Sequence, residues 1–142
     1  MRTATATSTQ ARFRQTIHVG RHVLVADEEV AAGGDDDGIA PHEWILAGLA
    51  ACTSMTIKMY AERKGWTLDS VQVKVAGDRV DGAFVMTRSI VVKGKLTDEQ
   101  SAHLLDIANK CPVHRSLTGP IRIETVLAAE ETTAASDSRQ QG

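Results

Sequence analysis

The feature that most constrains the fold is a stretch of about 24 residues, Pro41–Lys64, that nothing interrupts before Gly65. Proline suits the first turn of a helix, where its missing N–H is not needed, and a glycine directly after a cation is a usual helix stop. The first half of the stretch is apolar on nearly every side, so we expect one long, buried helix at the centre of the molecule. Its small residues would let other backbone approach closely: Ala47, Gly48, Ala50 and Ala51.

Size and charge narrow the class of protein. A chain of 142 residues, 42% of them hydrophobic, suffices for one domain with a single core. A net charge of −2 gives no electrostatic attraction to nucleic acid or to an anionic membrane, so we expect neither as a partner. We expect a cytoplasmic protein, because no segment has the length of a membrane span and the N-terminus lacks the apolar core of a signal peptide.

Alternating apolar and polar residues predict one hairpin before the long helix in the sequence and one after it. The first pairs residues 13–19 with 22–27 through Gly20 and Arg21, and the second pairs 70–78 with 83–94 through a polar turn. Between the first hairpin and the helix, residues 27–38 hold six carboxylates and three glycines, which indicates a solvated loop. The acids are contiguous, whereas a calcium-binding EF-hand loop needs them at alternating positions.

The second half of the chain predicts one more helix and one more strand. Thr97 and Gln100 form a capping-box pattern at the start of a helix. Pro112 does not continue that helix comfortably, so we expect a break at Cys111, a short turn over 112–117 and a last strand over 121–126. This order of elements predicts an α+β domain over residues 11–127. The two ends, 1–10 and 128–142, carry few large apolar residues, and we expect both to be disordered.

The two cysteines carry the main functional signal. A structural disulfide is unusual in the cytoplasm, so free thiols, a redox couple or metal ligands are the alternatives. If Pro112 opens a short helix, Cys111 caps it, and the unpaired N–H groups and helix dipole would stabilise a thiolate there. The other reading of Cys111 is a thiol that fills a corner of the fold. For Cys52, in the middle of the apolar helix, core packing is favoured over chemistry, because burial raises the pKa of a thiol.

These residues also carry a family resemblance, over roughly residues 13–126. Two motifs carry it: Pro41 is followed eleven residues later by Cys52, and the Cys111-Pro112 step follows the second predicted helix. With both motifs, the chain resembles the OsmC/Ohr family of thiol-dependent peroxidases, in particular its OsmC-like branch. The resemblance implies the OsmC-like fold: an antiparallel sheet, a long buried central helix and a second helix, in an intertwined homodimer with two active sites at the subunit interface.

The resemblance also implies a function and assigns roles to both cysteines. Cys52 would attack an organic hydroperoxide and become a sulfenic acid, which Cys111 would resolve as a disulfide. An external lipoyl or other dithiol would then reduce the disulfide, and no bound cofactor or metal is expected. The argument from local charge points the other way, since Cys111 has the better thiolate site.

In the family, an arginine and a glutamate that holds it lie beside the attacking cysteine. The arginine follows a glycine in the first turn, which matches Arg21; without the family pattern, Arg21 reads as an exposed turn residue. The glutamate should directly follow the helix-opening proline, where this chain has His42, and Glu43 comes one step later. One step turns a helical side chain by about 100°. Two residues are candidates to hold Arg21: Glu43, if the first turn of the helix frays, and His42, in its neutral form. The alternative for His42 is a surface residue without a role in the site.

Two readings without peroxide chemistry stay open. Cys52, Cys111, His114 and His42 offer ligands that would bind zinc if they converged. Alternatively, the protein is a non-catalytic dimer that binds a lipid-like or aromatic molecule at the subunit interface, with the cysteines only lining the pocket.

Overall fold

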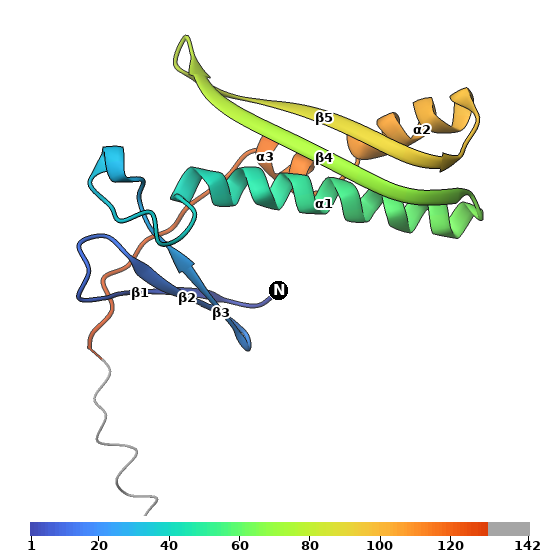
Figure 1. Cartoon of the computed structure of the whole chain (residues 1–142). Coiled ribbons are helices and arrows are strands. Elements are labelled where there is room, and N and C mark those ends of the chain that lie inside the picture. The colour runs from blue at the N-terminus through green and yellow to red at the C-terminus, as the bar shows by residue number, and fades with distance from the viewer. Residues whose placement is uncertain (131–142) are drawn as a thin grey trace, which may run out of the picture.

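The computed structural model describes residues 1–130 of the chain. Its elements are three strands, a short 3-10 turn, the long helix α1, a two-stranded hairpin and two shorter helices (Figure 1). The bounds are β1 Ala4–Ser8, β2 Gln15–Val19, β3 His22–Ala26, η1 Val30–Ala32, α1 Pro41–Lys64, β4 Thr67–Val80, β5 Ala83–Lys95, α2 Asp98–Ala108 and α3 Pro112–Thr118. The α+β class predicted from the sequence is confirmed.

The long hairpin β4–β5 is the platform for the helices. Its two strands pair antiparallel over their whole length, and Asp81 and Gly82 form the two-residue turn between them. Both turn residues have positive φ (50° and 81°), which suits Asp-Gly in a hairpin of this type. Side chains on β5 alternate between half-buried and exposed, and the half-buried series turns toward the helices: Phe84, Met86, Arg88, Ile90 and Val92.

Helix α1 begins and ends where the sequence predicts. Pro41 occupies its first turn, and Gly65 ends it in the left-handed conformation with φ 70°. One stripe of α1 is buried, at a spacing of four residues: Leu49, Thr53, Ile57 and Ala61. Met55 and Met59, both 59% exposed, lie outside this stripe, so a single chain buries only one face of the helix.

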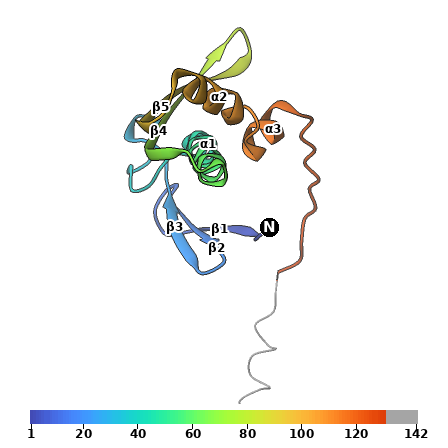
Figure 2. The ribbon, with the colours of Figure 1, turned by 90° about the vertical axis from the view of Figure 1, so that its right-hand side faces the viewer.

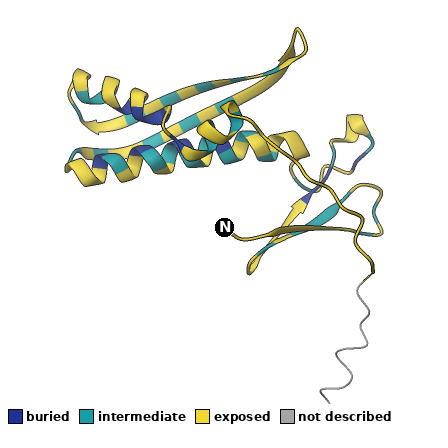
Figure 3. Ribbon diagram, turned by 180° about the vertical axis from the view of Figure 1, so that it is seen from behind, coloured by how far each residue is buried: buried dark blue, intermediate teal, exposed yellow. Residues whose placement is uncertain are grey.

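The core lies where α1, α2 and the β4–β5 hairpin meet (Figure 3). Ile57 and Ala61 of α1 pack with Leu104 and Ala108 of α2, and the apolar face of the hairpin covers them. Thr97 caps α2 through the predicted capping box: its hydroxyl accepts the Gln100 N–H, and the Gln100 side chain accepts the Thr97 N–H. The cap therefore fixes the start of the helix that leads to Cys111.

The N-terminal residues form a separate sheet of order β1-β2-β3 (Figure 2). The prediction that residues 1–10 are disordered is wrong, because Ala4–Ser8 pairs antiparallel with β2. Sheet pairing satisfies the backbone N–H and C=O groups, and it does so even for a strand of alanine, threonine and serine. The predicted hairpin of 13–19 with 22–27 is present as β2 and β3.

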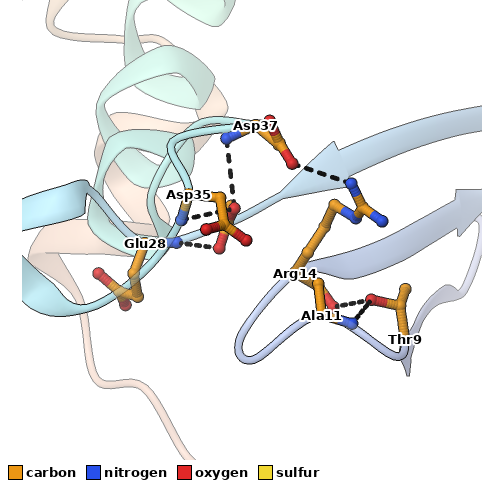
Figure 4. Close-up of polar contacts among 7 residues, drawn as sticks. Thr9, Ala11, Arg14, Glu28, Asp35 and Asp37 are labelled. Atoms are coloured by element: carbon orange, nitrogen blue, oxygen red, sulfur yellow. Dashed lines mark hydrogen bonds and ion pairs between the residues drawn. The ribbon is translucent and has the colours of Figure 1, made fainter.

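The acidic loop between β3 and α1 is organised by Asp27, which is only 3% exposed. Its carboxylate accepts the backbone N–H groups of Glu28, Asp35 and Asp37, at 2.8, 3.2 and 3.2 Å (Figure 4). Burial alone would raise the pKa of Asp27, but these hydrogen bonds and the charge of Arg14 lower it overall. The loop is thus held by one buried carboxylate, which the prediction of a solvated loop did not foresee.

After α3, residues 121–130 form neither helix nor strand. The predicted last strand over 121–126 is therefore wrong for the single chain, since no neighbouring strand is present to pair with it. Its apolar side chains are exposed, and Ile123 and Val126 reach 84% and 87%. The disordered tail predicted for 128–142 falls mostly outside the described residues. Among residues 1–130, no helix is both long and apolar enough to cross a membrane.

Candidate active site

Cys111 lies between α2 and α3 and is fully buried. It is the N-cap of α3, as the Cys111-Pro112 step predicts, and its Sγ accepts the His114 backbone N–H at 3.4 Å. Pro112 at the first helical position is favourable because its missing N–H needs no partner there. The cap directs N–H groups of α3 toward the sulfur, which is an arrangement that favours a thiolate.

Cys52 lies on α1, beside the buried stripe, and is half-buried. Its Sγ is 3.9 Å from the Thr56 hydroxyl one turn further along the helix. The Val113 backbone N–H, at the start of α3, acts to lower the pKa of the Cys52 thiol. Helix α3 therefore lies near the sulfurs of both cysteines.

The two cysteines meet, although they are far apart in the sequence. Both are free thiols, and each lies near enough to the other to shift its pKa. The packing of α3 against α1 places Cys111 beside Cys52. The structure thus brings together the two residues that the sequence analysis named first.

The two thiols differ in acidity. Burial raises the pKa of Cys52, and the hydrogen bond to Cys111 raises it further, which outweighs the opposing bonds from Val113 and Thr56. Burial also acts to raise the pKa of Cys111, but hydrogen bonds from Cys52, the N–H groups of α3 and Thr53 lower it overall. The two thiols therefore titrate as a coupled pair, with the thiolate favoured at Cys111 over Cys52.

Arg88 is a site residue that the sequence analysis missed. It lies on the inward face of β5, and its guanidinium reaches four acceptors: Thr53 Oγ1 at 3.0 Å, the Ala108 carbonyl at 3.3 Å, Asn109 Oδ1 at 2.8 Å and His114 Nδ1 at 3.2 Å. A signal was present in the sequence, because Arg88 is the one charged residue in the inward series from Phe84 to Val92. An arginine on an otherwise apolar face is uncommon unless it has partners.

A cavity of about 260 Å³ adjoins this cluster. Arg88 and His114 line one part of the cavity. The apolar part of its wall is formed by Leu49, Phe84, Met86 and Leu117. An apolar cavity with a few polar groups is the usual form of a small-molecule site.

The other predicted site residues do not join the cysteine pair in the single chain. Arg21 is exposed at the turn between β2 and β3, and none of its hydrogen bonds or ion pairs within residues 1–130 involves the site. Glu43 is exposed, and its carboxylate accepts the Ala40 N–H at 2.8 Å as part of the helix cap. His42 stacks edge-on against Phe84, with ring centroids 5.2 Å apart.

The helix itself explains why His42 and Glu43 are remote from Cys52. Cys52 lies nine positions after Glu43, which is roughly 14 Å along the helix axis. Among the hydrogen bonds and ion pairs of residues 1–130, none joins Arg21 to Glu43 or His42, and their pairing stays a prediction. Glu43 instead satisfies a backbone donor at the start of α1.

The zinc reading is not supported by the geometry of the described residues. Within residues 1–130, the one group of three or more metal-type ligand atoms that converge is Asp27, Asp35 and Asp37, and it contains no cysteine or histidine. His114 turns Nδ1 toward Arg88, and His42 packs on an aromatic ring.

The fold and the thiol pair define an α+β protein whose central helix and third helix present two free cysteines to each other. The sequence profile of the family described as OsmC-like protein matches residues 34–126, about two thirds of the chain. The chain belongs to the OsmC-like protein family. A comparison with curated protein sequences finds no match.

Solved structures show the same fold. An OsmC-like protein from Mycoplasma pneumoniae is 22% identical with a TM-score of 0.72, over 84% of this chain and 88% of that one. An organic hydroperoxide resistance protein from Legionella pneumophila is 19% identical with a TM-score of 0.65, over 84% and 90%. The organic hydroperoxide resistance protein OhrB of Bacillus subtilis is 24% identical with a TM-score of 0.58, over 84% and 91%. At these identities the likeness establishes the fold.

Proposed function

We propose that this protein reduces organic hydroperoxides to alcohols with Cys52 and Cys111 and is recycled by an external dithiol. The observation that carries the proposal is the proximity of two free thiols from distant parts of the chain, each of which shifts the pKa of the other. Membership of the OsmC-like family, whose fold is shared by proteins named for organic hydroperoxide resistance, supports the same reaction.

The catalytic cycle balances with these two residues. The Cys52 thiolate attacks the outer oxygen of the hydroperoxide, the S–O bond forms and the O–O bond breaks, and the alkoxide takes a proton from solvent to leave as the alcohol. The Cys111 thiol then attacks the sulfur of the Cys52 sulfenic acid. The S–S bond forms, the S–O bond breaks, and the hydroxyl leaves with the Cys111 proton as water. A dithiol reduces the disulfide and becomes a disulfide itself.

The assignment of Cys52 as the attacking residue rests on access. Cys111 is fully buried, whereas Cys52 is half-buried and can meet a substrate. Because the thiolate is favoured at Cys111, the Cys52 proton must first pass to Cys111, its neighbour in the coupled pair. That transfer leaves Cys52 ionised and Cys111 protonated, as the next two steps require.

The proposal includes a homodimer. Helix α1 leaves Met55 and Met59 exposed, and the segment after α3 exposes Ile121, Ile123 and Val126. Large apolar side chains exposed on two elements often mark surfaces that a partner covers, and a second copy would cover them. In such a dimer, Arg21 of one subunit would be available to the cysteine pair of the other.

Bulky substrates are favoured over hydrogen peroxide by the apolar cavity beside Arg88 and His114. Burying the hydrocarbon part of a hydroperoxide there contributes about 25 cal/mol for each Å² of apolar surface removed from water. Hydrogen peroxide has no such group to bury.

The test is consumption of cumene hydroperoxide and hydrogen peroxide with dihydrolipoamide as reductant. We expect turnover with a preference for cumene hydroperoxide, and loss of turnover in Cys52→Ser and in Cys111→Ser. Lys58→Ser, an exposed change on the same helix, is the matched control and should be as active as wild type. Absence of turnover by the wild type with every dithiol tried would contradict the proposal.

The second candidate, a non-catalytic dimer that binds a small apolar molecule, is favoured by the same cavity. It predicts saturable binding of an aromatic probe that is unchanged in Cys52→Ser, with no consumption of hydroperoxide. The turnover assay therefore distinguishes the two functions.

A further inference from the structure

Arg88 carries a positive charge that no carboxylate among residues 1–130 neutralises. Its four acceptors are a hydroxyl, a carbonyl, an amide and an imidazole, all uncharged groups. The ion pairs formed within residues 1–130 are Arg14 with Asp37 and Arg122 with Glu124, and neither involves Arg88. A half-buried cation without a counter-ion stabilises any negative charge that develops near it.

The contacts of Arg88 reach the three segments that build the thiol site. Its Nη1 donates to Thr53 of α1 and to the Ala108 carbonyl at the end of α2, and its Nη2 donates to Asn109 and contacts His114 of α3. The planar fork of a guanidinium can hold several acceptors in fixed directions, which a lysine cannot do. One side chain of β5 therefore ties together the elements that carry Cys52 and Cys111.

Two of these partners also act on Cys111. His114 donates its backbone N–H to Cys111 Sγ while its Nδ1 faces Arg88, an arrangement that places the ring proton on Nε2. The Thr53 hydroxyl accepts from Arg88 at 3.0 Å, donates to the Leu49 carbonyl at 2.7 Å, and is among the groups that lower the pKa of Cys111.

We infer that Arg88 is the positioning residue of the thiol pair: its guanidinium holds Thr53 and His114 against Cys111, and its unpaired charge favours the thiolate. Arg88 acts through these neighbours and has no bond to sulfur in the structure. The inference rests on the proposed function for its consequence in catalysis, but thiol ionisation can be measured without any peroxide. The titratable groups beside Cys111 are Cys52 from α1 and His114 from α3, and Arg88 from β5 reaches the site through its bond to His114; Lys110, the preceding residue in the chain, is exposed.

The test is the ultraviolet absorbance of the thiolate as a function of pH, in the full-length reduced protein. The spectrum of the Cys52→Ser/Cys111→Ser double variant is subtracted, so that the single tyrosine does not contribute. We expect Arg88→Met to move the midpoint of thiolate formation upward by about one pH unit, the lower end of the range for losing a nearby opposite charge. Arg79→Met, an exposed arginine of the same hairpin, is the matched control and should leave the midpoint unchanged.

Two further variants keep the test decisive if Arg88→Met does not fold. Arg88→Gln removes the charge but retains an amide donor, whereas Arg88→Lys retains the charge but loses the fork. The inference expects a midpoint clearly higher in Arg88→Gln than in Arg88→Lys. Coinciding midpoints in these two variants, or an unchanged midpoint in folded Arg88→Met, would overturn it.

The outcome is separable from that of the proposed function. A raised midpoint in the Arg88 variants together with no hydroperoxide turnover by the wild type would support Arg88 as a positioning residue and refute the peroxidase. Turnover by the wild type, together with an unchanged midpoint in the Arg88 variants, would support the peroxidase and refute Arg88 as a positioning residue.

Discussion

Oxidation of the cysteine pair should stabilise the protein strongly, because the bond would close a long loop. Cys52 and Cys111 are 59 positions apart (111 − 52), and their side chains are already near each other in the reduced protein. Cross-linking a loop of that length removes about 14 cal/mol/K of entropy from the unfolded chain, or about 4 kcal/mol at about 25 °C. Strain in the folded state would reduce this value, so we expect a net stabilisation of about 2–4 kcal/mol.

The assay is urea unfolding followed by circular dichroism, with protein concentration held constant. One sample is treated with one equivalent of cumene hydroperoxide and the other with dithiothreitol. For a slope of about 2 kcal/mol per M, the oxidised protein should unfold at a urea concentration about 1–2 M higher. Cys111→Ser is the control, and its two samples should unfold together.

Equal midpoints for the oxidised and reduced wild-type protein would refute the reasoning. That result would mean that the two thiols, although adjacent, do not form an intramolecular bond in the folded state. A lower midpoint after oxidation would show that the bond forms only at the cost of distorting the packing of α3 on α1.

Two further predictions concern the elements that support the site. Leu104 is 1% exposed, whereas Leu105 on the same helix is 59% exposed. In urea titrations, Leu104→Ala should lower the free energy of unfolding by about 2–5 kcal/mol, and Leu105→Ala should lower it by less than about 1 kcal/mol. Equal losses would contradict the assigned core. The lowered pKa of Asp27 means that its carboxylate stabilises the folded state above the unfolded value of 3.8, and that this stabilisation is lost as the pH falls below it. Asp27→Asn should therefore lose stability less steeply than wild type below that pH, and parallel pH curves would count against the buried carboxylate.

Much of the fold follows from local signals in the sequence. Pro41 and Gly65 bound α1, and Thr97 begins α2, because each residue suits one position at a helix end. The Cys111-Pro112 step likewise predicted the cap of α3. These features depend on a few neighbouring residues, which is why they could be predicted without knowledge of the tertiary structure.

What the sequence could not supply was tertiary pairing. Ala4–Ser8 has weak strand character, yet β2 provides a neighbour, so it forms β1. Residues 121–126 have strong strand character, yet no neighbour is present in the single chain, so no strand forms. Strand formation depends on the partner as much as on the segment itself.

The site shows the same division. The two cysteines could be named from their positions in predicted helices, but their contact depends on how α3 packs against α1. Arg88 could have been noticed as a charge on an apolar strand face, whereas its four acceptors come from three separate segments and only the folded chain reveals them. Arg21 and Glu43 were named by resemblance alone, and the single chain leaves both apart from the thiols.

The most direct test of the central claim is a count of free thiols after stoichiometric oxidation without any reductant. Reduced wild-type protein is mixed with one equivalent of cumene hydroperoxide, and free thiols are then counted in denaturant while the intact mass is measured. We expect both thiols to disappear, the chain to lose two hydrogens and one equivalent of alcohol to form, whereas Cys111→Ser should stop at a Cys52 sulfenic acid. Two free thiols and unconsumed hydroperoxide in the wild-type sample would contradict the account.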